Sequence, residues 1–272
     1  MIFEVTKAGY RLESISEILE EDFRDMESLI EHLISSFFEA NHILILFKKC
    51  FPREDEVNEL SDEVKTSLKE RLRTLIERDH PEYDSSTVEH LINLNLPLFE
   101  KRYRWKEGEL PRSFKRNLPH FYAKSFVFAL DNFQKSLKVI SLIPNLPNHL
   151  EIERILKEFD GHFIHLRGVR NSAHHMEDRI RGLGPYNKRL GKKEKIKPKP
   201  IDEHGIKADG GAMLINCLLN NNYSFTNDDG SLGKVEISEL SMSVFQKCLQ
   251  QLLNSFKWSN HFGADRIFLP DD

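Results

Sequence analysis

The chain of 272 residues contains few cysteines. Cys50, Cys217 and Cys248 are odd in number and far apart, and no two of them have the spacing C-x-x-C. A disulfide framework or a cysteine-based zinc site needs paired or closely spaced cysteines. The composition therefore argues against both classes of protein.

Long apolar runs are missing as well. No uninterrupted stretch approaches the roughly 20 apolar residues that a helix needs to span a bilayer. The first residues, MIFEVTKAGYRLESISEILEED, turn acidic without the apolar centre of a signal peptide. We therefore expect a protein that is not bound to a membrane and that resides in the cytoplasm.

Neither sign of charge dominates, and the common catalytic motifs are absent. The net charge is -4, so any surface that binds nucleic acid must be local. The sequence has no Gly-rich phosphate loop, no serine-hydrolase elbow and no H-E-x-x-H. We expect no cofactor and no metal. The four neighbouring histidines do not lie on one helix face, and no two of them are four residues apart: His162, His165, His174 and His175.

The spacing of apolar residues predicts a mainly α protein. Apolar residues recur at helical intervals in N-terminal helices over 14–110 and in core helices over 115–183. Long helices joined by short turns are typical of an antiparallel helical bundle. We expect residues 1–272 to form a single helical domain of this kind.

Two later segments interrupt the helical pattern. Residues 184–211 are basic and hold Gly and Pro, which favours a long loop. Residues 212–258 contain a β-insert followed by the final helix. Strands are expected at 212–219, 222–226 and 234–238, with the hairpin signal NDDG between the last two. The prediction is a small β-meander, or hairpin insert, before the last helix.

The stretch GVRNSAHHMEDRIRG, from Gly168 to Gly182, concentrates groups that bind anions or move protons. A helix predicted from Leu166 to Leu183 has one apolar seam at spacings of three and four: Leu166, Val169, Ala173, Met176, Ile180 and Leu183. The polar residues lie on the opposite face or flank it: Arg167, Asn171, His174, His175 and Asp178.

Arg170 does not share this polar face. On an ideal helix it lies about 140° from His175 but only about 40° from His174. Distortion of the helix, convergence of long side chains, or a second copy across a two-fold axis could bring Arg170 and His175 together. We favour the second copy, and hence a homodimer.

The segment RNSAHH, from Arg170 to His175, resembles the Arg-x4-6-His motif of the HEPN superfamily, whose frequent form is Arg-Asn-x-x-x-His. The helical architecture expected for residues 115–260 is similar to that of the family. The resemblance implies a metal-independent endoribonuclease that acts as a dimer on RNA. It also suggests a toxin or a defence effector, with an antitoxin as a further partner.

The same resemblance implies catalytic roles. His175 would be the general acid or base, Arg170 would hold the scissile phosphate, and Asn171 would orient the phosphate or the histidine. Attack by the ribose 2′-hydroxyl would leave a 2′,3′-cyclic phosphate, so DNA would not be cut. His174 competes with His175 for the histidine role, because it lies closer to Arg170 around the helix.

Basic residues near the motif are candidate contacts for RNA. Arg167 and His174 flank the polar face of the motif helix, and Lys192 and Lys193 belong to the basic segment NKRLGKKEKIKPKP, residues 187–200. The alternative for this segment is a solvated, mobile loop.

KRYRWK, residues 101–106, interleaves basic and aromatic side chains, as surfaces that stack bases do. The alternative is a connection that Tyr103 and Trp105 pin into the core.

Two other functions explain the same motif. A non-catalytic HEPN-like module would bind RNA or a protein partner without turnover. A structural helical protein would carry Arg170 and His175 as ordinary surface groups. In either case Asp178 is expected to pair with Arg181 on the helix surface.

Overall fold

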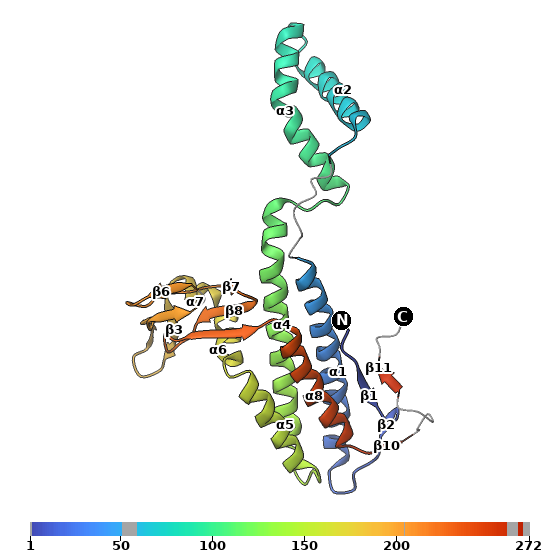
Figure 1. Cartoon of the computed structure of the whole chain (residues 1–272), viewed down its shortest axis with the longest axis vertical. Helices are drawn as coiled ribbons and strands as arrows, with labels where there is room; N and C mark the ends of the chain where they lie inside the picture. The colour runs from blue at the N-terminus through green and yellow to red at the C-terminus, as the bar shows by residue number, and fades with distance from the viewer. Residues whose placement is uncertain (1, 51–58, 204, 260–265, 269–272) are drawn as a thin grey trace. The chain divides into compact units, whose positions relative to one another are not determined.

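The structure is a computed structural model that describes these residues: 2–50, 59–203, 205–259 and 266–268. Within them the chain is mainly helical, as predicted (Figure 1). It divides into two compact units, which differs from the single domain expected for 1–272. Unit 1 comprises Met1–Cys50 and Pro119–Asp272, and unit 2 comprises Phe51–Leu118.

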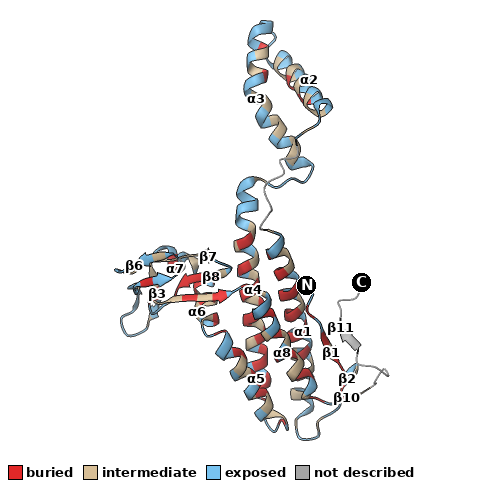
Figure 2. Cartoon of the chain, viewed as in Figure 1, coloured by how far each residue is buried: buried red, intermediate tan, exposed pale blue. Residues whose placement is uncertain are grey.

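Four helices of unit 1 pack around one apolar core. They are α1 (Glu20–Lys49), α4 (Arg112–Ile140, from Pro119 onward), α5 (His149–His162) and α8 (Glu239–Asn254). Their buried faces turn toward one another (Figure 2). This arrangement follows from the helical spacing of apolar residues, since each helix can bury only one side.

Aromatic rings at the centre of unit 1 join these four helices. The ring centroid of Phe245 in α8 lies 5.4 Å from that of Phe37 in α1 and 4.4 Å from that of Phe133 in α4. Phe159 in α5 lies 5.0 Å from Phe133. Such pairs add to the free energy of burying the rings.

Among the described residues, one helix, α1, is long and apolar enough to cross a bilayer. Half of the most apolar stretch of α1 is nevertheless buried inside the protein. Its apolar side chains belong to the core of unit 1, as those of a water-soluble protein do.

The N-terminal strands lie beside strands from the end of the chain (Figure 1). β1 (Val5–Lys7) pairs antiparallel with β11 (Arg266–Phe268), and β2 (Arg11–Leu12) pairs with β10 (Trp258–Ser259). The side-chain amide of Asn41 in α1 holds the segment before β1. It donates to the Phe3 carbonyl at 2.6 Å and accepts from the Phe3 N–H at 3.3 Å.

The predicted β-meander is present. β7 (Cys217–Leu219), β8 (Asn222–Thr226) and β9 (Leu232–Glu236) form an antiparallel sheet in that order. The first strand begins five residues later than the expected 212. Asn220 and Asn221 connect β7 to β8 with φ of 47° and 63°, the left-handed backbone that two-residue hairpin turns require.

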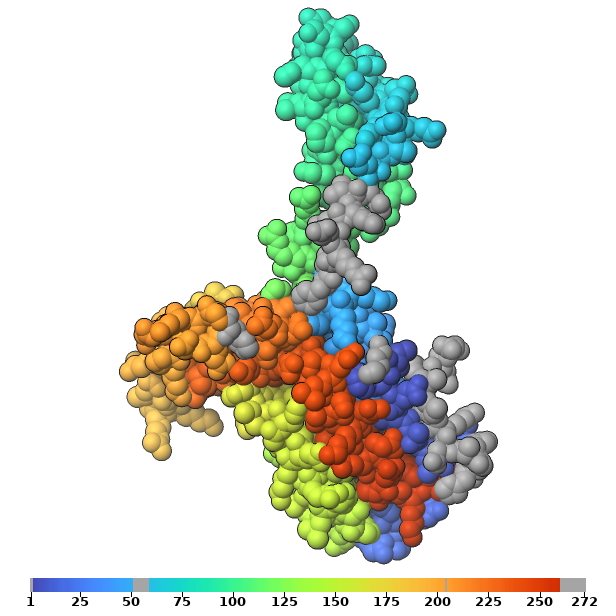
Figure 3. Space-filling model, viewed as in Figure 1, coloured from blue at the N-terminus to red at the C-terminus, as the bar shows by residue number. Residues whose placement is uncertain are grey.

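Residues 184–211 do not form the long loop that we expected. They contain four strands: β3 (Leu183–Asn187), β4 (Lys192–Lys195), β5 (Ile201–Glu203) and β6 (Ile206–Ala208). β3 pairs with β4 and β5 with β6, both antiparallel. This segment, gold to orange in Figure 3, lies on the surface of unit 1. Because β4 is exposed along its whole length, its sequence has no alternation of apolar and polar residues from which a strand could be predicted.

Unit 2 contains a hairpin of two helices, α2 (Asp62–Asp79) and α3 (Ser85–Lys106). Each helix begins at a side-chain cap. Ser61 accepts from the Val64 N–H at 3.4 Å, and Asp84 accepts from the Thr87 N–H at 2.7 Å. The buried core between the helices is small: Leu72, Val88 and Ile92.

Glu89 joins the two helices of the hairpin by charge. Its carboxylate oxygens lie 2.6 Å from Lys69 Nζ and 2.7 Å from Arg73 Nη2. The Lys69 hydrogen bond, with that of Arg73, lowers the pKa of Glu89. KRYRWK, residues 101–106, is the end of α3 and not the polar connection that we considered.

We expect Phe245→Ala to lower the free energy of unfolding of unit 1 by about 3–5 kcal/mol, because it leaves a cavity among three other rings. Chemical denaturation followed by circular dichroism measures the change. Leu240→Ala in the same helix, at a side chain that is 60% exposed, is the matched control and should shift stability by about 0.5 kcal/mol or less. Equal effects of the two substitutions would contradict this description of the core.

Candidate active site

The motif lies on α6 (Leu166–His174), which buries its apolar side, with Val169 fully buried, and packs on strands β8 and β9. Gly168 allows this close approach. A Cβ at that position would lie 2.5 Å from Oδ1 of Asn227, in the turn after β8. A larger residue would therefore require the side chain of Asn227, or α6 itself, to shift.

The continuous helix expected from Leu166 to Leu183 is wrong. α6 ends before His175, whose φ of -102° and ψ of 48° are not helical, and the short helix α7 (Met176–Ile180) follows. Ile180 consequently leaves the predicted apolar seam and is 69% exposed. Leu183 already belongs to β3.

Arg179 follows this break, and its buried guanidinium is bound by groups from several elements. Nε donates to Oγ of Ser172 at 3.1 Å, and Nη1 donates to the carbonyl of Leu183 at 2.6 Å. Nη2 forms an ion pair with Asp228, in the turn after β8. The Arg179 side chain is only 3% exposed, and a charge so buried needs such partners.

Arg170 is held against the core helix α4. Its Nε lies 2.9 Å from Oδ2 of Asp131, and Nζ of Lys135 lies 2.6 Å from the same oxygen. The distances define ion pairs, although Arg170 Nε and Asp131 Oδ2 are not aligned as a hydrogen bond. Nη1 of Arg170 also donates to Oδ1 of Asn171 at 3.1 Å. Arg170 is therefore not the ordinary solvated side chain of the structural alternative.

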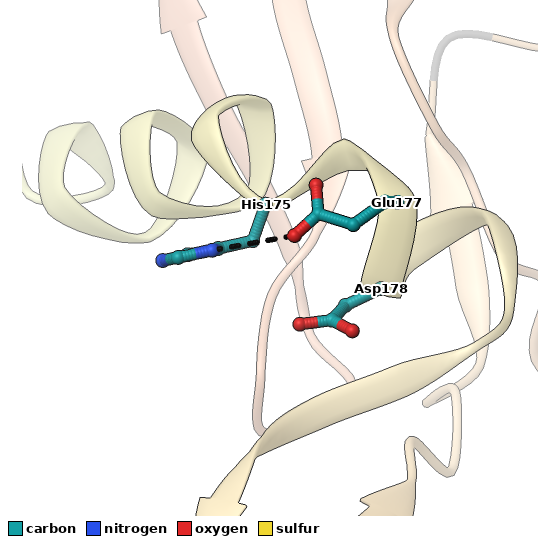
Figure 4. A group of neighbouring side chains, drawn as sticks. All are labelled: His175, Glu177 and Asp178. Atoms are coloured by element: carbon teal, nitrogen blue, oxygen red, sulfur yellow. Dashed lines mark ion pairs between the residues drawn. The ribbon is translucent and has the colours of Figure 1, made fainter.

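The two histidines lie near Arg170 but have different surroundings. The ring of Phe128 in α4 lies 5.9 Å from Cζ of Arg170 and 6.4 Å from the ring centroid of His174. The rings of His174 and His175 are 5.0 Å apart, edge to face. His175 is exposed, and its Nδ1 lies 3.7 Å from Oε1 of Glu177 (Figure 4). Thus Arg170 and His174 contact the same aromatic ring, whereas His175 pairs with α7.

Asp178 is not part of an exposed polar face with Asn171 and His175, as we expected. It is buried and pairs with Arg181, Oδ1 to Nη2, at 2.7 Å, which confirms that predicted pair. Its other oxygen binds the ammonium of Lys193. The Lys193 hydrogen bond is the main reason that the pKa of Asp178 lies below its ordinary value.

His175, Glu177 and Asp178 each offer one ligand atom within 4.8 Å of the others (Figure 4). Such a set of one imidazole and two carboxylates has the ligand types of a metal site. However, Lys193 and Arg181 already occupy the Asp178 carboxylate. A cation would have to bind next to two positive charges, so this set is a poor fit to a metal.

The structure brings only some of the predicted RNA-binding residues close to the motif. Lys193 reaches the motif through Asp178, and the β3–β4 hairpin packs beside α7. Lys192 is the neighbouring residue of β4 and is exposed, as is Arg167 on α6. Adjacent residues of a strand point to opposite sides, so Lys192 and Lys193 do not act from the same face.

Three residues of the site were not predicted from the sequence: Asp131, Arg179 and Asp228. Asp131 had a detectable signal, because it is a single carboxylate in the apolar run SFVFALDNF of a predicted core helix. Arg179 resembles any charged helix residue, and Asp228 resembles any turn residue. Only their tertiary contacts distinguish them.

Comparison of the chain with protein-family models, with curated proteins and with solved structures found no match.

We expect Arg179→Met to lower the free energy of unfolding by about 2–4 kcal/mol, because it leaves Ser172 and Asp228 without their charged partner. Thermal or chemical denaturation measures this loss. Arg167→Met, at an exposed position of α6, is the control and should change stability little. A stable Arg179→Met protein would show that this side chain does not hold the broken helix in place.

We expect Asp178 to stabilise the folded protein at neutral pH and to lose this effect in acid. Because folding lowers its pKa, the carboxylate stabilises the fold at pH values above its unfolded pKa of about 3.9. This contribution is lost as the pH falls through the lower, folded pKa. Asp178→Asn should therefore be less stable than the parent at neutral pH, and the difference should shrink in acid. A difference that grows in acid would contradict the pairing with Lys193 and Arg181.

Proposed function

We propose that this protein is a HEPN-like, metal-independent endoribonuclease built on an antiparallel helical bundle. The observation that carries the proposal is the position of Arg170. Its guanidinium is fixed at the surface of the core by Asp131 and Asn171, and two adjacent imidazoles follow it four and five residues later at the end of the same helix. A fixed cation beside groups that exchange protons near neutral pH is suited to cleaving a phosphodiester.

The reaction is transesterification within the RNA chain. One imidazole accepts the proton of a ribose 2′-hydroxyl while the 2′-oxygen attacks the adjacent phosphorus. The bond from phosphorus to the 5′-oxygen breaks, and a protonated imidazole donates a proton to that oxygen. The products are a 2′,3′-cyclic phosphate and a 5′-hydroxyl, so no metal or cofactor takes part.

Each residue has a role in this proposal. The Nη groups of Arg170 face the phosphate, because its Nε is turned to Asp131. Asn171 orients that guanidinium through its Oδ1. His175 is the general acid or base named by the motif, and its contact with Glu177 orients the ring. His174 is its competitor, favoured by its position on the same Phe128 ring as Arg170.

The basic hairpin β3–β4 and Arg167 supply further contacts to the RNA backbone. Exposed Lys192 binds phosphate directly, whereas Lys193 is shared with Asp178. A homodimer that joins two copies of α6 would complete the cleft. A cytoplasmic location and control by an antitoxin partner complete this proposal of a toxin or defence effector.

A non-catalytic HEPN-like module that binds RNA or a protein is the second candidate. One observation favours it: Asp131 lies within ion-pair distance of Arg170 and offsets part of the charge that a phosphate would use. In this case the motif would bind RNA weakly and leave it intact.

Cleavage of labelled RNA by the full chain in the presence of EDTA tests the proposal. We expect cleavage to a 2′,3′-cyclic phosphate, and no cleavage of an oligonucleotide with 2′-deoxyribose at the cut site. His175→Ala should lose about 100-fold or more of the rate, the usual contribution of a general acid or base. His162→Ala, an exposed histidine of α5, is the control and should keep full activity.

Three results would change the assignment. Full activity in His175→Ala together with a large loss in His174→Ala would move the role to His174. Full activity in both variants would exclude either imidazole as the base. Binding of RNA without turnover by the wild type would favour the second candidate.

A further inference from the structure

A second basic surface lies in unit 2, outside the motif. Residues 101–118 cover the end of α3 and the first turns of α4. They hold seven Lys or Arg against two Glu, although the whole chain has a net charge of -4. We call this segment the α3–α4 corner. Its excess of positive charge is local, as binding of a polyanion requires.

Glu109 holds the corner together. Its Oε2 lies 3.8 Å from Nη1 of Arg104 in α3, and its Oε1 lies 3.6 Å from Nζ of Lys115 in α4. The backbone closes the same turn, because the Glu109 N–H donates to the Arg104 carbonyl at 2.9 Å. The ends of the two helices are therefore neighbours, with Arg104 and Lys115 both close to Glu109.

Most cations of the corner are not used by the fold. Five are exposed and make no ion pair among the residues that the structure describes: Lys101, Arg102, Lys106, Arg112 and Arg116. The first turn of α4 contains no acidic residue. Cations at a helix N-terminus oppose its dipole, so those of α4 do not stabilise the helix that carries them.

Aromatic rings stand among these cations. Trp105 in α3 is 46% exposed and Phe114 in α4 is 59% exposed. Trp105 is thus not buried in the core, which was the structural alternative for KRYRWK. Its neighbours in sequence are Arg104 and Lys106, and Lys101 lies about one turn before it on the same helix.

We propose that the α3–α4 corner is a docking surface for single-stranded nucleic acid. Phosphates would bind the unpaired cations, and bases would stack on Trp105 and Phe114. A lipid bilayer fits less well, because an interfacial helix needs a continuous apolar face and here charges separate the two rings. The proposal does not depend on the ribonuclease assignment, since stacking and phosphate contacts need neither a 2′-hydroxyl nor cleavage.

Binding of the full chain to a fluorescent oligonucleotide of about 16 nucleotides tests the proposal. A 2′-O-methyl oligouridine is used because it cannot be cut through its 2′-oxygen, so loss of catalysis does not affect the result. We expect Trp105→Ala to weaken binding about fivefold or more, the effect of losing one stacked base. The triple variant Lys101→Gln, Arg102→Gln, Lys106→Gln should reduce the slope of log affinity against log salt by about 2.

Leu94→Ala is the matched control for Trp105→Ala. Leu94 is 67% exposed and lies within about 20° of Trp105 around α3, but three turns before it and away from the basic residues. It should leave oligonucleotide binding unchanged. Circular dichroism of all variants checks that α2 and α3 remain folded.

Three outcomes would overturn the proposal. Unchanged affinity and salt dependence in both Trp105→Ala and the triple variant would exclude the corner. An equal loss of oligonucleotide binding with Leu94→Ala would show that the effect is not specific to the ring of Trp105, and so would exclude stacking at the corner. Binding to vesicles of anionic lipid, with none to the oligonucleotide, would identify a membrane surface.

Discussion

The geometry of the motif depends on one buried charge, the guanidinium of Arg179. A cation with 3% of its side chain exposed must be bound on all sides, and its partners come from α6, from the start of β3 and from the turn after β8. The chain leaves the helix at His175, between Arg179 and its partner Ser172. Arg179 also binds the Leu183 carbonyl at the start of β3, and the neighbouring Asp178 binds Lys193 in β4, so the hairpin β3–β4 is tied to the end of the motif.

Asp131 has a similar effect on the other side of α6. It is buried in a helix whose other inward residues are apolar except for Ser136, and two cations lie close to its Oδ2. Removing either cation would leave a carboxylate in a medium of low dielectric constant, so Arg170 is kept near α4. The result is an arginine whose orientation is set by the core while part of its side chain remains exposed, as recognition of an anion requires.

The proposed activity combines these two constraints. His174 ends one helix, His175 separates it from the next, and Arg179 is bound just after this break. The contact with Asp131 determines which atoms of Arg170 remain available. The motif thus lies at a helix end next to a basic hairpin, and not on the solvated face of a straight helix. Unit 2 presents a separate basic surface whose exposed rings and unpaired cations are not explained by the stability of the hairpin.

Some of this could be predicted from the sequence alone. Apolar residues at helical spacing predicted the mainly helical fold, and alternating residues with Asn and Gly at the turns predicted the β-meander, because these patterns depend on local geometry. The pairing of Asp178 with Arg181 was predicted for the same reason, since only three residues separate them. The tertiary structure decided the break at His175, the partners of Arg170 and Arg179, the strands in residues 184–211 and the division into two units. The ion pairs of Arg170 with Asp131 and of Arg179 with Asp228 join residues far apart in the chain, so no local pattern predicts them. The strands in 184–211 pair locally, but the exposed strand β4 carries no alternation of apolar and polar residues from which it could be predicted.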